Sequence, residues 1–542
     1  MRNTVIFTFI IASCFLANAQ TSDRNITIER DYTPVIQDAG KISSTPEVFE
    51  KNEAKENVVY SDFDFPLPVS QNIQALSSAK ANMYVVPNKD AYLRLGLGNY
   101  YNNLFDFFLP ILKKPDYNLN FGINHLAAFG ERIHSNSKAK LNFDKSFENI
   151  MFFAGAGGGY EHFNYYGNYY LNNSVFDTTT YNYNKQSLVR FNAFAGISSM
   201  PDAENWRYSG QFKFNLLNAQ NGLSEKVFST PVSLNFYYKD HRVGLDFDFN
   251  YIQYTSTDFT DTKAYAPTII NPYYQYENGK LKARLGATLG LSFGDSSIGY
   301  GQMFTFAPDA YAEIIAFPKW LVLYGGVGGG LKINTLDKTY SENRYTIPAE
   351  RIEDTYTPLD IYIGWKLKPY HNVLFDVFAD YRVIENQHFF VNQQIDNILT
   401  NRFAVEYSRA SLIKFGTRLA ANFNEIVDLQ AKFAINQWNP SEFDHAWHMP
   451  AIEADFATNI HITRDITASA NVFYIGERTA KTIGSIETMK PVVDVNIGGT
   501  YAYANWLSFF VKANNLLNSR YDEYFGYQVQ GLNVLVGATV SF

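Results

Sequence analysis

The chain has 542 residues, of which 46% are hydrophobic and 17% aromatic, with 39 tyrosines, 45 phenylalanines and a single cysteine. The net charge of -8 argues against a nucleic-acid partner, and no apolar run beyond the extreme N-terminus reaches the length of a membrane-spanning helix. Many aromatic residues without such a run are typical of a transmembrane β-barrel, because apolar and polar residues alternate along each strand and the mean hydropathy stays low.

Residues 1–19 have the pattern of a secretory signal peptide. Arg2 supplies the positive charge, residues 5–16 form the apolar core, and Ala17 and Ala19 form a small-residue cleavage site. The alternative is a lipoprotein signal that ends at Cys14, because residues 11–14 read Ile-Ala-Ser-Cys. Cleavage after Ala19 would leave no cysteine for a disulfide, a thiolate nucleophile or a metal site.

The next segment, residues 20–89, is polar, carries both signs of charge and is interrupted by prolines. Such a composition buries little surface, so we expect a mostly irregular periplasmic segment. We also expect residues 58–86 to enter or cap the periplasmic mouth of the barrel. A short β-prone run, Ile26, Thr27 and Ile28, is a candidate contact for a periplasmic partner; an ordinary short strand or linker is the alternative.

Residues 90–542 read as one series of alternating strands, which predicts an all-β, transmembrane antiparallel barrel. One face of each strand is free of charge, as a lipid-facing surface requires, since Arg or Lys near the midplane costs about 2–4 kcal/mol. The other face carries charged residues that we expect to line the lumen. They are Asp246, Asp248, Asp376, Asp380, Asp428 and Asp494, with Arg207, Lys213, Arg382 and Lys432. Wall polarity accounts for them without catalysis.

Short and long connections alternate between the predicted strands. We expect ten short periplasmic turns, near residues 113–116, 145–148, 200–205, 239–242, 277–280, 318–319, 368–372, 424–425, 463–465 and 503–505. The largest external loops are expected at residues 161–186, 335–358 and 386–401. With both chain ends in the periplasm, these turns predict about 22 strands; 20 or 24 are the alternatives.

No catalytic, cofactor-binding or metal-binding constellation is predicted. The glycine-rich runs at residues 155–159 and 325–330 lack phosphate-loop spacing, so we expect a bend or close packing against something in the lumen there. Residues 442–448 contain Glu442, Asp444, His445 and His448, which we interpret as a solvated loop rim rather than a zinc site, since a third ligand would be needed. We therefore expect that the protein is not an enzyme and has no cofactor.

Tyrosines are concentrated in the long loop after residue 161. Tyrosine and asparagine form adaptable recognition surfaces, so the loop is a candidate contact for a ligand or partner. Its candidate residues are Tyr165, Tyr166, Tyr169, Tyr170, Tyr181 and Tyr183. An aromatic girdle with a strand pair extending beyond the membrane is the alternative.

The last stretch of the chain resembles the end of a TonB-dependent receptor barrel. Residues 514–518 read Asn-Asn-Leu-Leu-Asn and are followed by Tyr521, Gly531 and a final strand that ends at Phe542. The resemblance implies an outer-membrane barrel, with Val540 and Phe542 as the insertion signal for the barrel-assembly machinery. Receptors of that family carry a globular plug before the barrel, and residues 20–89 are too short for one.

These observations favour an integral outer-membrane barrel of this receptor type that transports or binds a solute. The alternative is a plug-less barrel that serves as a scaffold or assembly subunit of an envelope protein complex. We expect outer-membrane lipids and the barrel-assembly machinery as partners, and a periplasmic or outer-membrane protein as a further one.

Overall fold

The structure is a computed structural model. It describes residues 91–542, apart from residues 168–183, 201–202, 204, 221, 256–262, 296–298, 300, 318–319, 348–351, 371, 396–397 and 424–425. The predicted signal peptide and residues 20–89, including Ile26, Thr27 and Ile28, lie outside the described residues.

The main sheet of the described chain has 22 strands, all paired antiparallel along the sequence. They are β1 (Tyr92–Gly98), β2 (Asn103–Lys113), β3 (Tyr117–Phe129), β4 (Ile133–Ser146), β5 (Ile150–Asn164), β6 (Lys185–Ser199), β7 (Trp206–Ala219), β8 (Ser224–Tyr238), β9 (His241–Thr255), β10 (Lys263–Glu277), β11 (Leu281–Gly294), β12 (Phe304–Phe317), β13 (Leu321–Lys332), β14 (Thr355–Tyr370), β15 (Val373–Ile395), β16 (Ile398–Phe423), β17 (Val427–Pro440), β18 (Ile452–His461), β19 (Ile466–Ile475), β22 (Val492–Ala504), β23 (Leu507–Asn514) and β26 (Asn533–Ser541). The connections hold the helices η2 (Asn99–Tyr101) and α3 (Leu336–Glu342) and two small hairpins, β20 (Arg478–Lys481) with β21 (Ile486–Met489) and β24 (Asp522–Tyr524) with β25 (Tyr527–Gln528).

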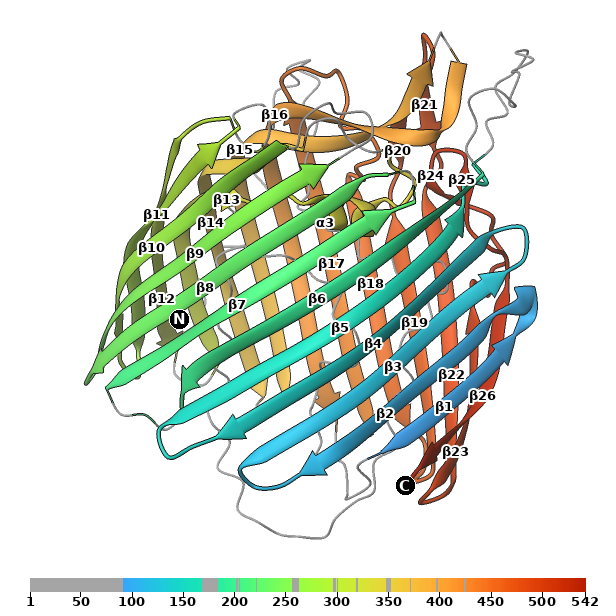
Figure 1. Ribbon diagram of the computed structural model, residues 1–542, viewed down its shortest axis with the longest axis horizontal. Coiled ribbons are helices and arrows are strands. Elements are labelled where there is room, and N and C mark those ends of the chain that lie inside the picture. Colours follow the sequence, from blue (N-terminus) through green and yellow to red (C-terminus); the bar gives the residue numbers. More distant parts are fainter. Residues whose placement is uncertain are drawn as a thin grey trace, which may run out of the picture.

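The first and last strands close the sheet into a barrel. β1 pairs with β26 along its whole length, from Tyr92 opposite Ser541 to Gly98 opposite Leu535. Figure 1 shows the resulting wall, with strongly tilted strands. Closure removes the open edge that the apolar final strand would otherwise present. The predicted antiparallel barrel of about 22 strands is therefore confirmed.

Within the described residues, no helix combines the length and the apolar character needed to cross a bilayer.

Each of the ten predicted short turns lies between two successive strands. The predicted loop at residues 386–401 was wrong, because the structure continues β15 and β16 through this region as paired strands of 23 and 26 residues. These strands are too long to be confined to a membrane, where about 9–11 tilted residues suffice. Their ends therefore project from the barrel on the side of the long connections, which is the extracellular side.

The outer surface of the wall is apolar and the inner surface is polar. Leu97, Leu285 and Ile363 are 70%, 68% and 66% exposed, as lipid-facing side chains are in an isolated barrel. By contrast, Asp376 and Arg382, which were predicted to face the lumen, are buried. Arg418 Nε lies 3.5 Å from Asp376, and Arg382 Nε lies 3.2 Å from Asp360. Ion pairs between neighbouring strands thus compensate the inward charges.

Glycines in the strands make room for luminal rings, as predicted. A Cβ atom on Gly155 would lie 2.6 Å from the Phe194 ring, and one on Gly326 would lie 2.5 Å from the Tyr362 hydroxyl. Each ring therefore lies directly over the backbone of a neighbouring strand, a contact that any larger residue would block.

Candidate functional site

The extracellular mouth of the barrel is covered by the projecting part of β15 and β16. Beyond the pair Ile384 and Ala410, the two strands continue as a two-stranded flap made of residues 387–395 and 398–408. Figure 1 shows β15 and β16 crossing the end of the barrel that lies opposite the marked C-terminus. Both faces of the flap are largely buried, and Phe389, Phe390 and Phe403 are 0–3% exposed.

The flap reaches the opposite side of the barrel. The Asn401 side chain on β16 donates a hydrogen bond of 2.9 Å to the Tyr165 carbonyl, directly after β5. From β5 to β16 is eleven steps in a closed ring of 22 strands, which is half of the circumference. The flap therefore spans the mouth, and this hydrogen bond holds its far end.

A second layer lies against the flap. It is the inner loop, residues 333–347 and 352–354, which contains α3. The helix starts at its N-cap Thr335, and its first amides donate to the Glu225 carboxylate of β8, at 2.5 Å from Leu336 N and 3.3 Å from Asp337 N. A carboxylate at this position satisfies the amides that a first helical turn leaves free.

The flap and the inner loop are joined by backbone hydrogen bonds. Phe403 N donates to Tyr345 O at 3.0 Å, and Ile347 N donates to Phe403 O at 2.8 Å. The His388 ring on the flap lies 2.9 Å from the Glu342 carboxylate at the end of α3. We call the flap and the inner loop together the cap.

A buried cluster of charges anchors the cap to the wall near β5. The Glu161 carboxylate accepts from Arg190 Nη1 at 2.6 Å, lies 3.1 Å from His134 Nε2 and forms an ion pair of 3.4 Å with Arg344 Nη1 of the inner loop. Arg190 Nε also donates to Asp337 of α3 at 2.5 Å. The loss of one partner from such a cluster leaves an uncompensated charge, so the cluster holds the cap specifically in this position.

The other end of the inner loop is fastened to β10. The Asp354 carboxylate accepts from the Tyr265 hydroxyl at 3.0 Å and from Asn334 N at 2.9 Å, so it also ties the two ends of the loop together. Burial raises the pKa of Asp354 to about 7, despite these two donors.

Aromatic rings fill the space between the cap and the connection at residues 515–532. Tyr345 stacks on Tyr527 with ring centroids 3.7 Å apart, and Tyr166 packs against Tyr527 at 5.0 Å. The Tyr527 hydroxyl donates to the Asn401 carbonyl. Burial raises the pKa of Tyr166 to about 12, so its hydroxyl stays protonated and donates to Gln528 O at 3.1 Å.

His448 joins three extracellular connections, and its interpretation as part of a solvated rim was wrong. Its Nδ1 donates to the Phe390 carbonyl at 2.8 Å and its Nε2 accepts from Phe525 N at 3.4 Å, which fixes the neutral ring. Burial lowers its pKa to about 3. His445 packs on Trp447 instead, with ring centroids 5.6 Å apart. No group of three or more metal-ligating residues occurs among the residues that the structure describes.

Two of the six predicted contact tyrosines, Tyr165 and Tyr166, are part of this aromatic layer. The others, Tyr169, Tyr170, Tyr181 and Tyr183, lie outside the described residues, and a ligand-binding role for the set remains a prediction. Glu161, Arg190, Asn401 and Tyr527 were not predicted as site residues, because no periodicity in the sequence marks residues that meet only in the folded connections.

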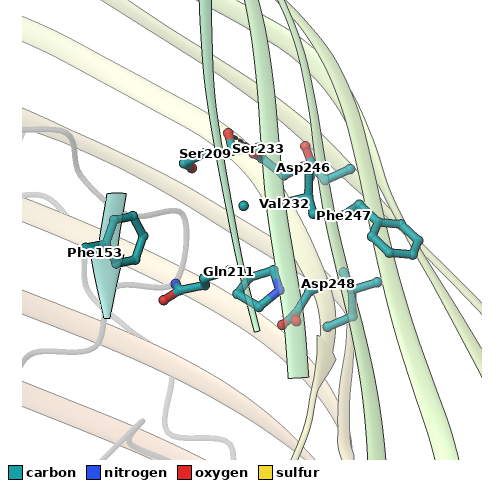
Figure 2. A pocket seen from close by; sticks show the side chains of 12 residues that line it. Phe153, Ser209, Gln211, Val232, Ser233, Asp246, Phe247 and Asp248 are labelled. Atoms are coloured by element: carbon teal, nitrogen blue, oxygen red, sulfur yellow. Dashed lines mark hydrogen bonds between the residues drawn. The ribbon is translucent and has the colours of Figure 1, made fainter. Parts of the chain in front are cut away.

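Below the cap, the luminal wall has a cavity of about 280 Å³. Figure 2 shows the Phe153 ring of β5 across from polar side chains of β7, β8 and β9. Its polar lining consists of Ser209, Gln211, Ser233, Asp246, Asp248 and Asn271. Ser233 Oγ donates to Asp246 at 2.6 Å. The rest of the lining comes from Phe153, Gly210, Pro231, Val232, Phe247 and Ile269, so the cavity has both polar and apolar walls.

No family model and no curated protein matches the chain. Solved structures do share its fold. The copper transporter OprC has 11% identity over 83% of this chain and 80% of its own, with a TM-score of 0.62. The siderophore receptor PirA from Acinetobacter baumannii has 9% identity over 83% of this chain and 80% of its own, with a TM-score of 0.61. The pyoverdine outer membrane receptor FpvA from Pseudomonas aeruginosa has 11% identity over 83% of this chain and 78% of its own, with a TM-score of 0.61.

These similarities agree with the closed barrel, its apolar outer surface and the resemblance of the last strand. The chain is therefore an outer-membrane β-barrel protein with the fold of TonB-dependent receptor barrels.

Proposed function

We propose that the protein is a receptor-type outer-membrane barrel that admits a polar solute to its lumen when the cap opens. The observation that carries this proposal is the flap, which spans the mouth from β16 to β5 over a polar lumen. A 22-stranded barrel encloses a wide space, and a protein that passes solutes through it selectively has to close it. The names of the similar proteins, a copper transporter and siderophore receptors, support a transport or receptor role.

The cavity under the cap is the candidate contact for the solute. Asp246 and Asp248 supply acceptors, Gln211 supplies an amide and the Phe153 ring supplies an apolar face. Such a mixed lining orients a polar solute by hydrogen bonds while burying its apolar edge.

Conductance in planar bilayers tests solute passage. The intact protein should be closed, and deletion of residues 58–86 should raise the conductance of a variant in which the flap and the inner loop have each been replaced by a short turn. Deletion of residues 25–48 is the matched control and should have no effect. A barrel that stays closed after removal of the flap, the inner loop and residues 58–86 would refute a solute path through the lumen.

The second candidate is a scaffold in an envelope complex. The buried charges around Glu161 favour it, because a cap held by such a cluster can be a permanent closure. Purification of the tagged protein in mild detergent distinguishes the two: a stoichiometric envelope protein would support the scaffold, and a bound small molecule would support the receptor.

A further inference from the structure

Three neighbouring strand pairs lose their register at one height of the wall. The shifts lie between Gly328 and Gly330 in the β13–β14 pair, between Tyr356 and Leu359 in β14–β15, and between Ile384 and Gln387 in β15–β16. They form a continuous row, because Tyr356 lies opposite both Leu331 of β13 and Glu385 of β15. We call this row the crease: residues 328–330, 356–359 and 384–387.

The backbone of the crease is unusual on two of its strands. Gly329 and Gly330 have φ angles of 150° and 141°, and Asn386 has a φ of 54°. Only glycine adopts the first two readily, and a Cβ atom on Gly329 would lie 2.2 Å from Thr357 O. Register shifts of this kind bend strands and are common at barrel rims. The sheet therefore bends along the crease.

Both layers of the cap begin at the crease. The inner loop starts directly after Lys332, the last residue of β13, and ends directly before Thr355, the first residue of β14, so both of its ends lie within a few residues of the crease. The flap starts at Gln387 on β15 and ends at Ser408 on β16. The two layers are joined by the backbone hydrogen bonds of Phe403 with Tyr345 and Ile347, so they form one body whose backbone continues into the wall at the crease.

Away from the crease, the cap is held by side-chain contacts, which include those of Glu225 with α3 and of Tyr265 with Asp354. A backbone hydrogen bond of 2.8 Å from Gly299 N to Ile352 O adds to them. On the β5 side the side-chain contacts are Asn401 to Tyr165 and the ion pairs of Glu161 and Arg190 with Arg344 and Asp337. At the rim they include Tyr527 to the Asn401 carbonyl and His448 to Phe390. Such contacts can break without any rearrangement of the barrel ladder.

We infer that the crease is a hinge about which the flap and the inner loop swing as one body to open the mouth. The inference rests on the proposed function, since it describes how the closed lumen becomes accessible. Asn386 is the hinge residue that can be tested, because its positive φ belongs to the closed cap and a strand without the bend would not require it.

Distance measurements by electron paramagnetic resonance test the hinge in the full-length protein in nanodiscs. Spin labels are placed at Q394C, exposed on the flap, and at K226C, exposed on β8. The measurement is made in an E161Q background, in which the anchor is weakened. Folded protein is verified by heat-modifiable gel migration.

The variant N386V should shift the population toward the longer distance. A β-branched residue strains a backbone with φ near 54° only while the cap is closed, so the ratio of open to closed protein should rise roughly 5- to 100-fold. The matched control is K239V, because Lys239 has a φ of 53° in a periplasmic turn; it should leave the ratio unchanged.

A single short distance in folded E161Q and N386V proteins alike would overturn the hinge, as would an open population that N386V does not alter. Failure of the proposed function looks different. If the distances shift as expected while the conductance experiment shows no path through the lumen, the hinge stands and solute passage is refuted.

Discussion

Replacement of Glu161 by glutamine should release the cap. In the closed state this carboxylate compensates Arg190 and Arg344, and it also contacts His134. Removal of one partner from a buried ionic cluster costs about 3–5 kcal/mol, because the remaining charges are left buried and unpaired. If the cost falls on the closed cap, the equilibrium constant for opening should rise roughly 10²- to 10⁴-fold, at about 1.4 kcal/mol for each factor of ten.

A thiol in the lumen reports this opening. S209C places a cysteine at the cavity under the cap, and the natural Cys14 lies within the predicted signal peptide. Intact cells are treated with a membrane-impermeant maleimide, and the labelling rate is compared between E161Q and the parent. E148Q, in an exposed periplasmic turn, is the matched control. Equal labelling rates in folded E161Q and parent protein would refute the reasoning that this cluster keeps the mouth closed.

Further variants test other contacts. D354N should make cap opening less dependent on pH. Burial raises the pKa of Asp354 to about 7, so the contribution of this residue to closure is complete below about pH 4 and is lost as the pH rises through 7. S209C labelling should therefore increase over this pH range less steeply in D354N than in the parent. Y527F removes the donor to the Asn401 carbonyl but keeps the ring stacked on Tyr345, so labelling should increase only about fivefold, for a hydrogen bond worth about 1 kcal/mol; a rate equal to that of Y527A would contradict this division. Deletion of Val540, Ser541 and Phe542 should strongly reduce folded protein in the outer membrane, as measured by heat-modifiable migration, since Val540 pairs with both Leu93 and Leu507; normal amounts would show that the end is dispensable.

The barrel itself could be predicted from the sequence, because its determinants are local. Each strand carries its own alternation, as in Phe375 to Arg382, where the inward side is charged and the outward side is apolar. A lipid surface tolerates no other arrangement, so the face of every strand follows from its residues alone. The short turns then set the number of strands, and the ring of 22 follows from closure.

The cap could not be predicted in this way, because its contacts join residues far apart in the sequence. Asn401 meets Tyr165 and Tyr527 across the mouth, and Glu161 meets Arg344, although none of these residues has a local pattern that indicates its partner. The alternation that identifies a strand does not show where the pairing of that strand with its neighbour shifts register. Only the tertiary structure decided that β15 and β16 bend over the mouth, because that bend depends on the register of four strands at once.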